Sequence, residues 1–253
     1  MSKLEKPLID AANEALKWCR IYTTFVCFAD PVEKYQAGIY NSATCTFHDT
    51  GSAKFGVTNY HVINGYREKR KEIPDLVFQV GCYRVDIDKY IISEDENLDL
   101  ATFALPDEVW KALEKEGKQY CFSSKWPPDR IIQGETIFYL GFPGIFRERF
   151  TKTEYNFYMV ALCEVVDSVS ERQFGVAIDR DTWVQQFGIK CISELTDYGG
   201  FSGACIFRLP DRQITSLEPV GILFEAGDTM ELHFVRHIEF IDSTGKILKN
   251  TEQ

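Results

Sequence analysis

Three short stretches of the sequence carry side chains that together could perform nucleophilic catalysis. His61 lies in "GVTNYHVI", Asp99 lies in "LDLATFAL", and Ser202 lies among glycines in "DYGGFSGACIF". A histidine can accept the proton of a serine hydroxyl, and a carboxylate can hold the imidazole in the required tautomer. Glycines around a serine allow a tight turn that exposes the hydroxyl and directs backbone N–H groups to one point. The order His, Asp, Ser therefore indicates acyl transfer.

Each stretch taken alone also has a structural interpretation. A lone histidine in an apolar run is commonly a buried residue bonded to a backbone carbonyl. Asp99 alone would be a turn or cap residue, and "GGFSG" alone would be a loop before a strand. Only the occurrence of all three in one order favours catalysis.

Composition limits the classes of partner. The 253 residues are 45% hydrophobic, 14% aromatic and 26% charged, which is ordinary for a globular protein. The net charge of −10 argues against nucleic acid or an anionic membrane as the main partner, because both select for clustered Lys and Arg.

The first residues and the cysteines suggest the compartment. "MSKLEKPLIDAANEALKWCR" has no apolar run long enough for a signal-peptide core or a membrane span, so we expect a cytoplasmic protein. Eight cysteines occur without a C-x-x-C pair or a Cys/His cluster. We therefore expect reduced structural thiols, no metal and no cofactor.

The hydrophobic pattern divides the chain into one helix and two strand-rich halves. Apolar residues at three- and four-residue steps predict an amphipathic helix over roughly residues 5–20, with an N-terminal helical unit at 1–21. Short runs rich in Val, Ile, Phe, Tyr and Thr, separated by turn residues, then predict an all-β architecture. We expect two packed six-stranded antiparallel β-barrels, the first at 22–115 with His61 and Asp99, the second at 116–245 with Ser202. Residues 246–253 are expected to be a fraying tail.

The motifs resemble those of the trypsin-like serine peptidases of the chymotrypsin fold, closest to the bacterial Deg/HtrA and glutamyl-endopeptidase-like branch. "VTNYHVI" is similar to the T-N-x-H-V block, "LDLATFAL" to the D-L-A block and "GGFSGACIF" to the G-x-S-G-G-P block, while "TIFYLGFPG" is similar to the strand that ends in G-x-P. The resemblance extends from about Thr23 to Ile241. It implies a peptidase that cleaves proteins or peptides through an acyl-enzyme.

The resemblance also implies roles for individual residues. Ser202 would be the nucleophile, His61 the general base and Asp99 the orienting carboxylate, with the backbone N–H groups of Gly200 and Ser202 as the oxyanion hole. The substrate would pair as an extended strand with Gly221, Ile222 and Leu223. Thr196, Asp197 and Glu225 would lie near the primary specificity pocket, and an acid pointing into that pocket would favour a Lys or Arg before the cleaved bond.

The sequence departs from the family pattern in two places. Phe201 stands where secreted members carry an Asp that pairs with a newly cut N-terminus, so we do not expect that mode of activation. Ala204 and Cys205 replace Gly-Pro, and Cys205 is expected to fill the core rather than act as a nucleophile. From the length of the sequence we also do not expect the peptide-binding module of Deg/HtrA proteases. A partner or ligand that orders the glycine-rich loop before Ser202 is a further expectation.

Two alternatives remain open at this point. An α/β-hydrolase would need the order Ser, acid, His, for example Ser202, Asp228 and His233 or His237, together with alternating helices and strands. A trypsin-like fold could instead serve as an inactive binding module. His48 is expected to be a surface turn residue, and the basic run "REKRK" is expected to be a solvated hairpin tip.

Overall fold

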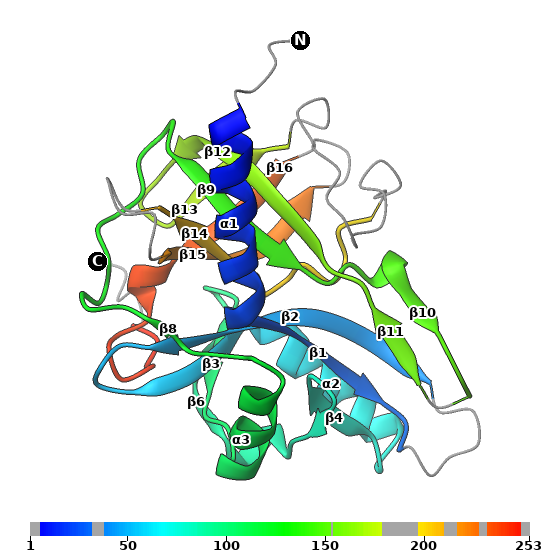
Figure 1. Ribbon diagram of the computed structural model, residues 1–253. Helices are drawn as coiled ribbons and strands as arrows, with labels where there is room; N and C mark the ends of the chain where they lie inside the picture. Colours follow the sequence, from blue (N-terminus) through cyan, green and yellow to red (C-terminus); the bar gives the residue numbers. More distant parts are fainter. Residues whose placement is uncertain are drawn as a thin grey trace.

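The computed structural model describes residues 6–31, 38–152, 154–178, 197–209, 217–227 and 232–248. In these residues the strands form an open sheet, a closed barrel and a two-stranded hairpin. Figure 1 shows the barrel above the open sheet, with the N-terminal helix lying along the barrel and ending at the sheet.

The second half of the chain forms the closed barrel that the sequence predicted. Six antiparallel strands close in the order β12-β13-β16-β15-β14-β9. Their bounds are β9 (Thr136–Gly141), β12 (Val160–Val169), β13 (Gln173–Ala177), β14 (Cys205–Arg208), β15 (Glu218–Gly227) and β16 (Leu232–His237). Closure gives each of the six strands a neighbour on both sides over part of its length.

The first half forms an open sheet, so the prediction of two closed barrels is wrong for this half. The strands follow the order β5-β4-β1-β2-β3-β7-β6. Their bounds are β1 (Thr23–Ala29), β2 (Ile39–Asp49), β3 (Lys54–Thr58), β4 (Val77–Val80), β5 (Tyr83–Arg84), β6 (Ile91–Asp95) and β7 (Leu100–Phe103), and β8 (Cys121–Phe122) pairs in parallel with β2. In the described ranges no pairing joins β5 to β6.

Two helices explain why the sheet stays open. They are α2 (Tyr60–Glu72) and α3 (Asp107–Lys115), and both pack on this sheet. One apolar cluster combines residues of α2 and α3 with sheet residues Phe28, Phe78 and Phe103; the helical members are Val62, Ile63, Tyr66, Val109 and Leu113. The helices thus bury the apolar face that the facing strands of a barrel would otherwise bury.

The run "REKRK" lies on α2 and not at a hairpin tip. Tyr66 anchors this part of the helix in the core, and Lys71 pairs with Glu68 on the exposed face at 2.6 Å. Pairs of opposite charge three or four residues apart stabilise a helix.

The predicted N-terminal helix is confirmed as α1 (Lys6–Tyr22). Ala15, Leu16, Cys19 and Tyr22 are buried at three- and four-residue steps. They share a core cluster with Phe207 and other barrel residues, so the helix covers the barrel with one apolar face.

The hairpin of β10 (Arg147–Arg149) and β11 (Tyr155–Phe157) follows the short helix η2 (Gly144–Phe146). It leaves the barrel and reaches toward β1 and β2 of the open sheet (Figure 1). The Phe157 ring stacks on Phe25 of β1 with 3.9 Å between ring centroids.

Residues 246–248 of the predicted tail are bound to the rest of the fold, whereas residues 249–253 lie outside the described residues. After η5 (Ile238–Phe240), Ile247 pairs with Ile241 and is buried. Thr50 donates to the Ser243 carbonyl at 2.6 Å, and Thr102 donates to the Gly245 carbonyl at 2.5 Å. Residues 241–248, called the C-terminal clasp below, therefore tie the sequence after the barrel to the open sheet.

None of the described helices is long and apolar enough to cross a membrane. The seven cysteines within the described ranges are free thiols, and Cys191 lies outside those ranges.

Candidate active site

His61 lies in the first turn of α2, shortly after the end of β3. β3 ends at Thr58, and Asn59 takes an extended conformation (φ −88°, ψ 152°) immediately before the helix. The first N–H groups of a helix have no partner within it. Asp99 supplies one, because its Oδ1 accepts the backbone N–H of His61 at 2.9 Å.

The same carboxylate binds the His61 ring. Asp99 Oδ2 lies 2.7 Å from His61 Nδ1, and the side chains are 19% and 47% exposed respectively. One carboxylate thus fixes both the backbone and the ring of His61. Because Nδ1 is occupied by Asp99, Nε2 is the nitrogen available to a reacting group.

Asp99 is held in an unusual backbone conformation. It has φ 53°, the one positive φ of a non-glycine residue among the described residues. Asn59 Nδ2 donates to its carbonyl at 2.7 Å, and Arg236 Nε donates to the preceding carbonyl, that of Leu98, at 3.0 Å. These hydrogen bonds hold Asp99 in its strained backbone conformation, as is common at functional sites.

Arg236 is a residue that the sequence analysis missed. It lies on β16, is 6% exposed, and its guanidinium stacks on the Phe224 ring at 4.3 Å. Burial lowers its pKa, while the charges of Asp99 and Asp95 act in the opposite direction. An arginine inside the apolar run "LHFVRHIEFI" is the signal that could have identified it.

Ser202 lies in a chain segment folded into two successive turns. The first turn is closed by Phe201 N–H to the Tyr198 carbonyl (3.0 Å), the second by Ala204 N–H to the Phe201 carbonyl (2.8 Å). Gly200 (φ 106°) and Gly203 (φ 86°) take the third position of each, which requires a positive φ.

The same glycines let the turns approach neighbouring backbone. A Cβ on Gly200 would lie 2.3 Å from the Phe142 carbonyl oxygen. A Cβ on Gly203 would lie 2.1 Å from the Thr44 carbonyl oxygen and 2.6 Å from Thr58 Oγ1. Thr58 ends the strand that leads into His61, so the Ser202 turn packs directly against the base of the His61 segment.

The backbone N–H groups of Gly200 and Ser202 have no acceptor among the described residues. The carbonyl groups around them are bonded: Thr44 Oγ1 donates to the Gly200 carbonyl at 2.7 Å, and Gly144 N–H donates to the Gly199 carbonyl at 2.7 Å. The turn is therefore held through its carbonyl groups, while two N–H groups stay available to an anionic oxygen.

In the described part of the chain, no hydrogen bond joins Ser202 Oγ to the His61 ring. The structure thus binds His61 to Asp99 and packs the Ser202 turn beside Thr58, without a direct bond to the serine. Catalytic hydrogen bonds are often long without substrate and tighten in the complex.

The loop before Ser202 was expected to need a partner to become ordered. Tyr198 is 2% exposed, and Asp197 Oδ1 accepts the Gly199 N–H at 2.7 Å. Phe201 is fully buried, with its ring over Gly141 and near Tyr139 and His233. Apolar packing thus anchors the turn in the chain as it stands.

Gly221, Ile222 and Leu223 lie in the interior of the barrel, which corrects their prediction as the substrate-pairing edge. Gly221 and Ile222 pair with β14 on one side and with β16 on the other. Leu223 N–H donates to the Ala204 carbonyl, and the Leu223 carbonyl accepts the Gly203 N–H. None of the three has an unpaired side.

The free edge begins one residue later. The register on β16 shifts between Leu223 and Glu225, and Glu225 and Ala226 then pair only with Phe234 and His233 of β16. In the described chain no strand pairs with the other side of residues 224–226. Sequence alone could not separate these residues from 221–223, because both lie in one apolar run.

The predicted specificity residues have separate outcomes. Thr196 and Asp228 lie outside the described residues. Asp197 uses its carboxylate in the local turn at Gly199, and Glu225 is exposed on the free edge. No three His, Cys, Asp or Glu side chains in the described residues lie together as a metal site.

His48 is buried and not at the surface, which corrects its prediction as a turn residue. It lies within β2, fully buried, near the rings of Phe55 and Trp126. Neither ring nitrogen has a hydrogen-bond partner among the described residues, and burial lowers the pKa of His48 to about 3. His48 therefore stays neutral.

The remaining candidate nucleophile and bases lie in the barrel. Cys205 is buried on β14, and burial raises the pKa of its thiol well above the usual value. His237 binds the Ser170 carbonyl, and His233 binds Tyr139. The antiparallel barrel around them differs from the parallel sheet of an α/β-hydrolase.

Comparisons with known proteins do not assign a family. No protein-family model matches the chain. No curated protein matches it either. Among solved structures, 168 chains match. One of them matches with a TM-score of 0.46 and 12% identity, covering 87% of each chain; its structure is described as "Aromatic interactions drive the coupled folding and binding of the intrinsically disordered Sesbania mosaic virus VPg protein". A similarity at this TM-score carries no argument about function.

Proposed function

We propose that this chain is a serine endopeptidase that cleaves protein substrates through an acyl-enzyme, with its activity regulated inside the cell. The observation that carries the proposal is the pair of hydrogen bonds between the Asp99 carboxylate and His61, at 2.9 Å to the backbone N–H and 2.7 Å to the ring. They lie beside a serine on a glycine-rich turn. A purely structural histidine does not need an exposed ring with a partly buried carboxylate behind it.

In the proposed reaction, His61 Nε2 takes the proton of Ser202 Oγ as the oxygen attacks the substrate carbonyl. Asp99 holds the tautomer and stabilises the imidazolium. The N–H groups of Gly200 and Ser202 bind the oxyanion, and His61 then returns the proton to the leaving amine. Water repeats the sequence to release the acyl group.

The substrate would bind as an extended strand. Its acyl half would pair with the free side of residues 224–226, which lie next to the Ser202 turn through the Leu223 backbone. Arg236 stacks beneath Phe224 on this edge and holds Leu98 beside Asp99. It is thus a positioning residue between the substrate edge and the carboxylate.

The alternative is an inactive trypsin-like domain that serves as a binding module. The observation that favours it is the lack of a hydrogen bond from Ser202 Oγ to His61 within the described residues. A protein or ligand partner that closes this gap would convert such a latent site into an active one.

A fluorophosphonate probe tests the proposal, with labelling read by intact mass. We expect one label per wild-type chain, and none in Ser202→Ala or His61→Ala. His237→Ala is the matched control, because its ring bonds a backbone carbonyl within the barrel and should leave labelling unchanged. A folded wild-type chain that takes no label would contradict an active peptidase and favour the binding module.

A further inference from the structure

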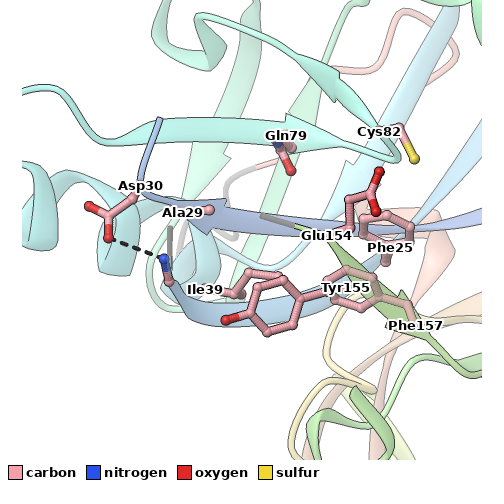
Figure 2. Close-up of a pocket in the computed structure, with 10 residues that line it drawn as sticks. Phe25, Ala29, Asp30, Ile39, Gln79, Cys82, Glu154, Tyr155 and Phe157 are labelled. Atoms are coloured by element: carbon pink, nitrogen blue, oxygen red, sulfur yellow. Dashed lines mark hydrogen bonds between the residues drawn. The ribbon is translucent and has the colours of Figure 1, made fainter. Parts of the chain in front are cut away.

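A pocket of about 380 Å³ lies between the open sheet and the β10–β11 hairpin, away from the proposed catalytic residues. Strands β1, β2, β4 and β11 all contribute to its walls. Figure 2 shows Glu154 next to Cys82, with the rings of Phe25, Tyr155 and Phe157 nearby, and Asp30 at another point of the wall. Its volume is in the range of small-molecule and side-chain binding sites.

The wall of this pocket combines aromatic rings with carboxylates. Phe25 and Phe157 stack with 9° between their planes and form a fixed apolar surface. Asp30 and Glu154 supply two acidic groups, and among the described residues that line the pocket there is no Lys or Arg. A lysine or arginine side chain complements both features, because its methylene stem packs on rings while its head meets carboxylates.

The two carboxylates differ in their surroundings. Asp30 Oδ2 accepts Gly38 N–H at 3.2 Å and the Tyr40 hydroxyl at 3.1 Å, so it is fixed in place. Glu154 lies at the exposed rim of the pocket. Arg149 already stacks on Tyr155 at 5.1 Å, which shows that this surface accommodates a guanidinium.

One peptide bond relates the pocket to the Ser202 turn. The Ser202 carbonyl accepts Thr44 N–H of β2, while the Gly203 N–H donates to the Leu223 carbonyl of β15. The C=O and N–H of one trans peptide point in opposite directions. Strands β2 and β15 therefore lie on opposite sides of the Ser202 turn.

The leaving half of a bound substrate would thus run along β2 toward the pocket. The acyl half occupies the β15 side in the proposed complex, so the other half extends toward Thr44 and the residues before it. Ile39, which lines the pocket, precedes Thr44 by five residues. At about 3.3 Å per residue, the pocket lies roughly 16 Å from the cleaved bond along an extended chain.

We propose that this pocket binds a lysine or arginine side chain of the substrate, about four to six residues after the cleaved bond. A position counted from the cleaved bond exists only if the chain cleaves peptides, so this proposal rests on the proposed function. The cation-binding property itself does not depend on catalysis, and the two are tested separately.

The first experiment uses cleavage. Wild-type protein digests a library of proteome-derived peptides, and the new N-termini are sequenced by mass spectrometry. We expect Lys and Arg to be enriched at the fourth to sixth positions after the cut, and Glu154→Gln to reduce that enrichment about threefold, as expected for one partly exposed ion pair. Glu148→Gln, on the same hairpin but outside the pocket, is the matched control and should keep the enrichment.

The second experiment uses Cys82 as a reporter without catalysis. Cys82 lines the pocket and is an exposed thiol, so iodoacetamide can alkylate it at alkaline pH. In the Ser202→Ala protein we expect acetyl-Gly-Lys-Gly-amide to slow this alkylation about twofold or more at saturating concentration. The matched acetyl-Gly-norleucine-Gly-amide should not, and Glu154→Gln should remove the protection.

The outcomes separate the two proposals. If the lysine peptide protects Cys82 and the chain takes no fluorophosphonate label, the pocket proposal stands and the peptidase proposal is contradicted. Labelling without basic enrichment and without Cys82 protection would overturn the pocket and retain the peptidase. Equal protection by both peptides would also overturn the pocket as a site for a cation.

Discussion

At the residue scale, Asp99 makes two interactions with His61, and a substitution can weaken one of them while it keeps the other. Its Oδ1 caps α2 at His61 N–H, and its Oδ2 binds the His61 ring. An asparagine can still accept the helix N–H, since Asn and Asp are similar caps. It cannot stabilise an imidazolium in the same way, and it favours the wrong tautomer.

We therefore expect Asp99→Asn to slow fluorophosphonate labelling by about 10⁴-fold, as for the matching substitution in other triads. The free energy of unfolding should change by less than about 1 kcal/mol, because the cap is kept. Labelling reactions quenched at a series of times measure the rate, and urea denaturation measures the free energy of unfolding. Asp88→Asn, which loses an ion pair with Arg67 outside the site, should label at the wild-type rate. Equal rates for Asp99→Asn and wild type would exclude Asp99 from catalysis.

His48 makes the stability of the fold depend on acid. Its pKa is lowered from 6.5 to about 3 by burial, so the unfolded chain binds a proton that the folded chain refuses. Stability is then full above pH 6.5 and falls as the pH decreases toward 3, by about 1.4 kcal/mol per pH unit for one proton. Below the folded pKa the dependence ends.

We expect His48→Phe to lower the slope of stability against pH by about 1.4 kcal/mol per pH unit, because the phenyl ring fits the aromatic surroundings and carries no proton, while buried His233 keeps its own contribution. It should also raise stability at neutral pH, since both His48 nitrogens lack partners. Urea denaturation at several pH values gives both results. His61→Ala is the control, because His61 is exposed. A slope unchanged by His48→Phe would assign the acid sensitivity to other groups, such as buried His233.

At the scale of elements, the Ser202 turn depends on one close approach between strands. Gly203 (φ 86°) and Gly117 (φ 87°) have nearly the same φ. An alanine Cβ at Gly203 would collide with the Thr44 carbonyl of β2, whereas at Gly117 nothing lies within 4 Å. Alanine variants of the two glycines thus distinguish backbone strain, which both variants have, from steric collision, which only the Gly203 variant has.

We expect Gly117→Ala to cost about 1 kcal/mol of unfolding free energy and to leave labelling intact. Gly203→Ala should cost about 1–3 kcal/mol more, because β2 must move away. It should also slow labelling by about 100-fold or more, since a displacement near 1 Å has that effect on positioned groups. Thermal unfolding and labelling rates measure both. Equal behaviour of the two variants would mean that β2 does not set the position of Ser202.

Sequence patterns predicted the elements that bury a regular apolar face. Helix α1 and the strands of the barrel follow their periods closely, and the glycines around Ser202 correctly indicated tight turns. Helix α2 was missed because Tyr60, Val62 and Ile63 continue the β-branched and aromatic composition of β3 without interruption. The contact of Asp99 with the start of α2, 38 residues away in sequence, is a tertiary feature that no local pattern contains.

Burial and edge position were also beyond the sequence. His48 in "TFHDTG" has the polar neighbours of a turn, yet β2 continues through it under Trp126. The open form of the first sheet depends on α2 and α3 filling its inner face, which follows from packing and not from strand patterns.

At the scale of the whole molecule, the C-terminal clasp joins the open sheet to the sequence after the barrel. Its contacts include Thr50 to Ser243, Thr102 to Gly245, and Ile247 N–H to Ser93 Oγ at 3.1 Å. Trp126 Nε1 adds a bond to the Ile241 carbonyl at 2.7 Å. The segment thus bonds to residues of β6 and β7 and to the loops around them.

A chain that stops at Asp242 should lose the bonds of Ser243, Gly245 and Ile247, while it keeps the Trp126 bond to Ile241. Its free energy of unfolding should fall by about 2–4 kcal/mol for these hydrogen bonds and the buried Ile247 together, so it should unfold at a lower urea concentration. A chain that stops at Leu248 keeps every clasp contact and is the control. We expect far-UV circular dichroism to show the same fold for both at low urea. Equal stability of the two chains would show that the clasp is not a structural tie.

The placement of the proposed triad has a consequence for synthesis on the ribosome. His61 and Asp99 belong to the half that emerges first, and Ser202 to the half that emerges last, on a turn that needs Thr44 and Leu223 together. A nascent chain would therefore carry a base without a nucleophile until the barrel closes. Under the proposed function, the catalytic site is therefore completed only when the second half has folded onto the first.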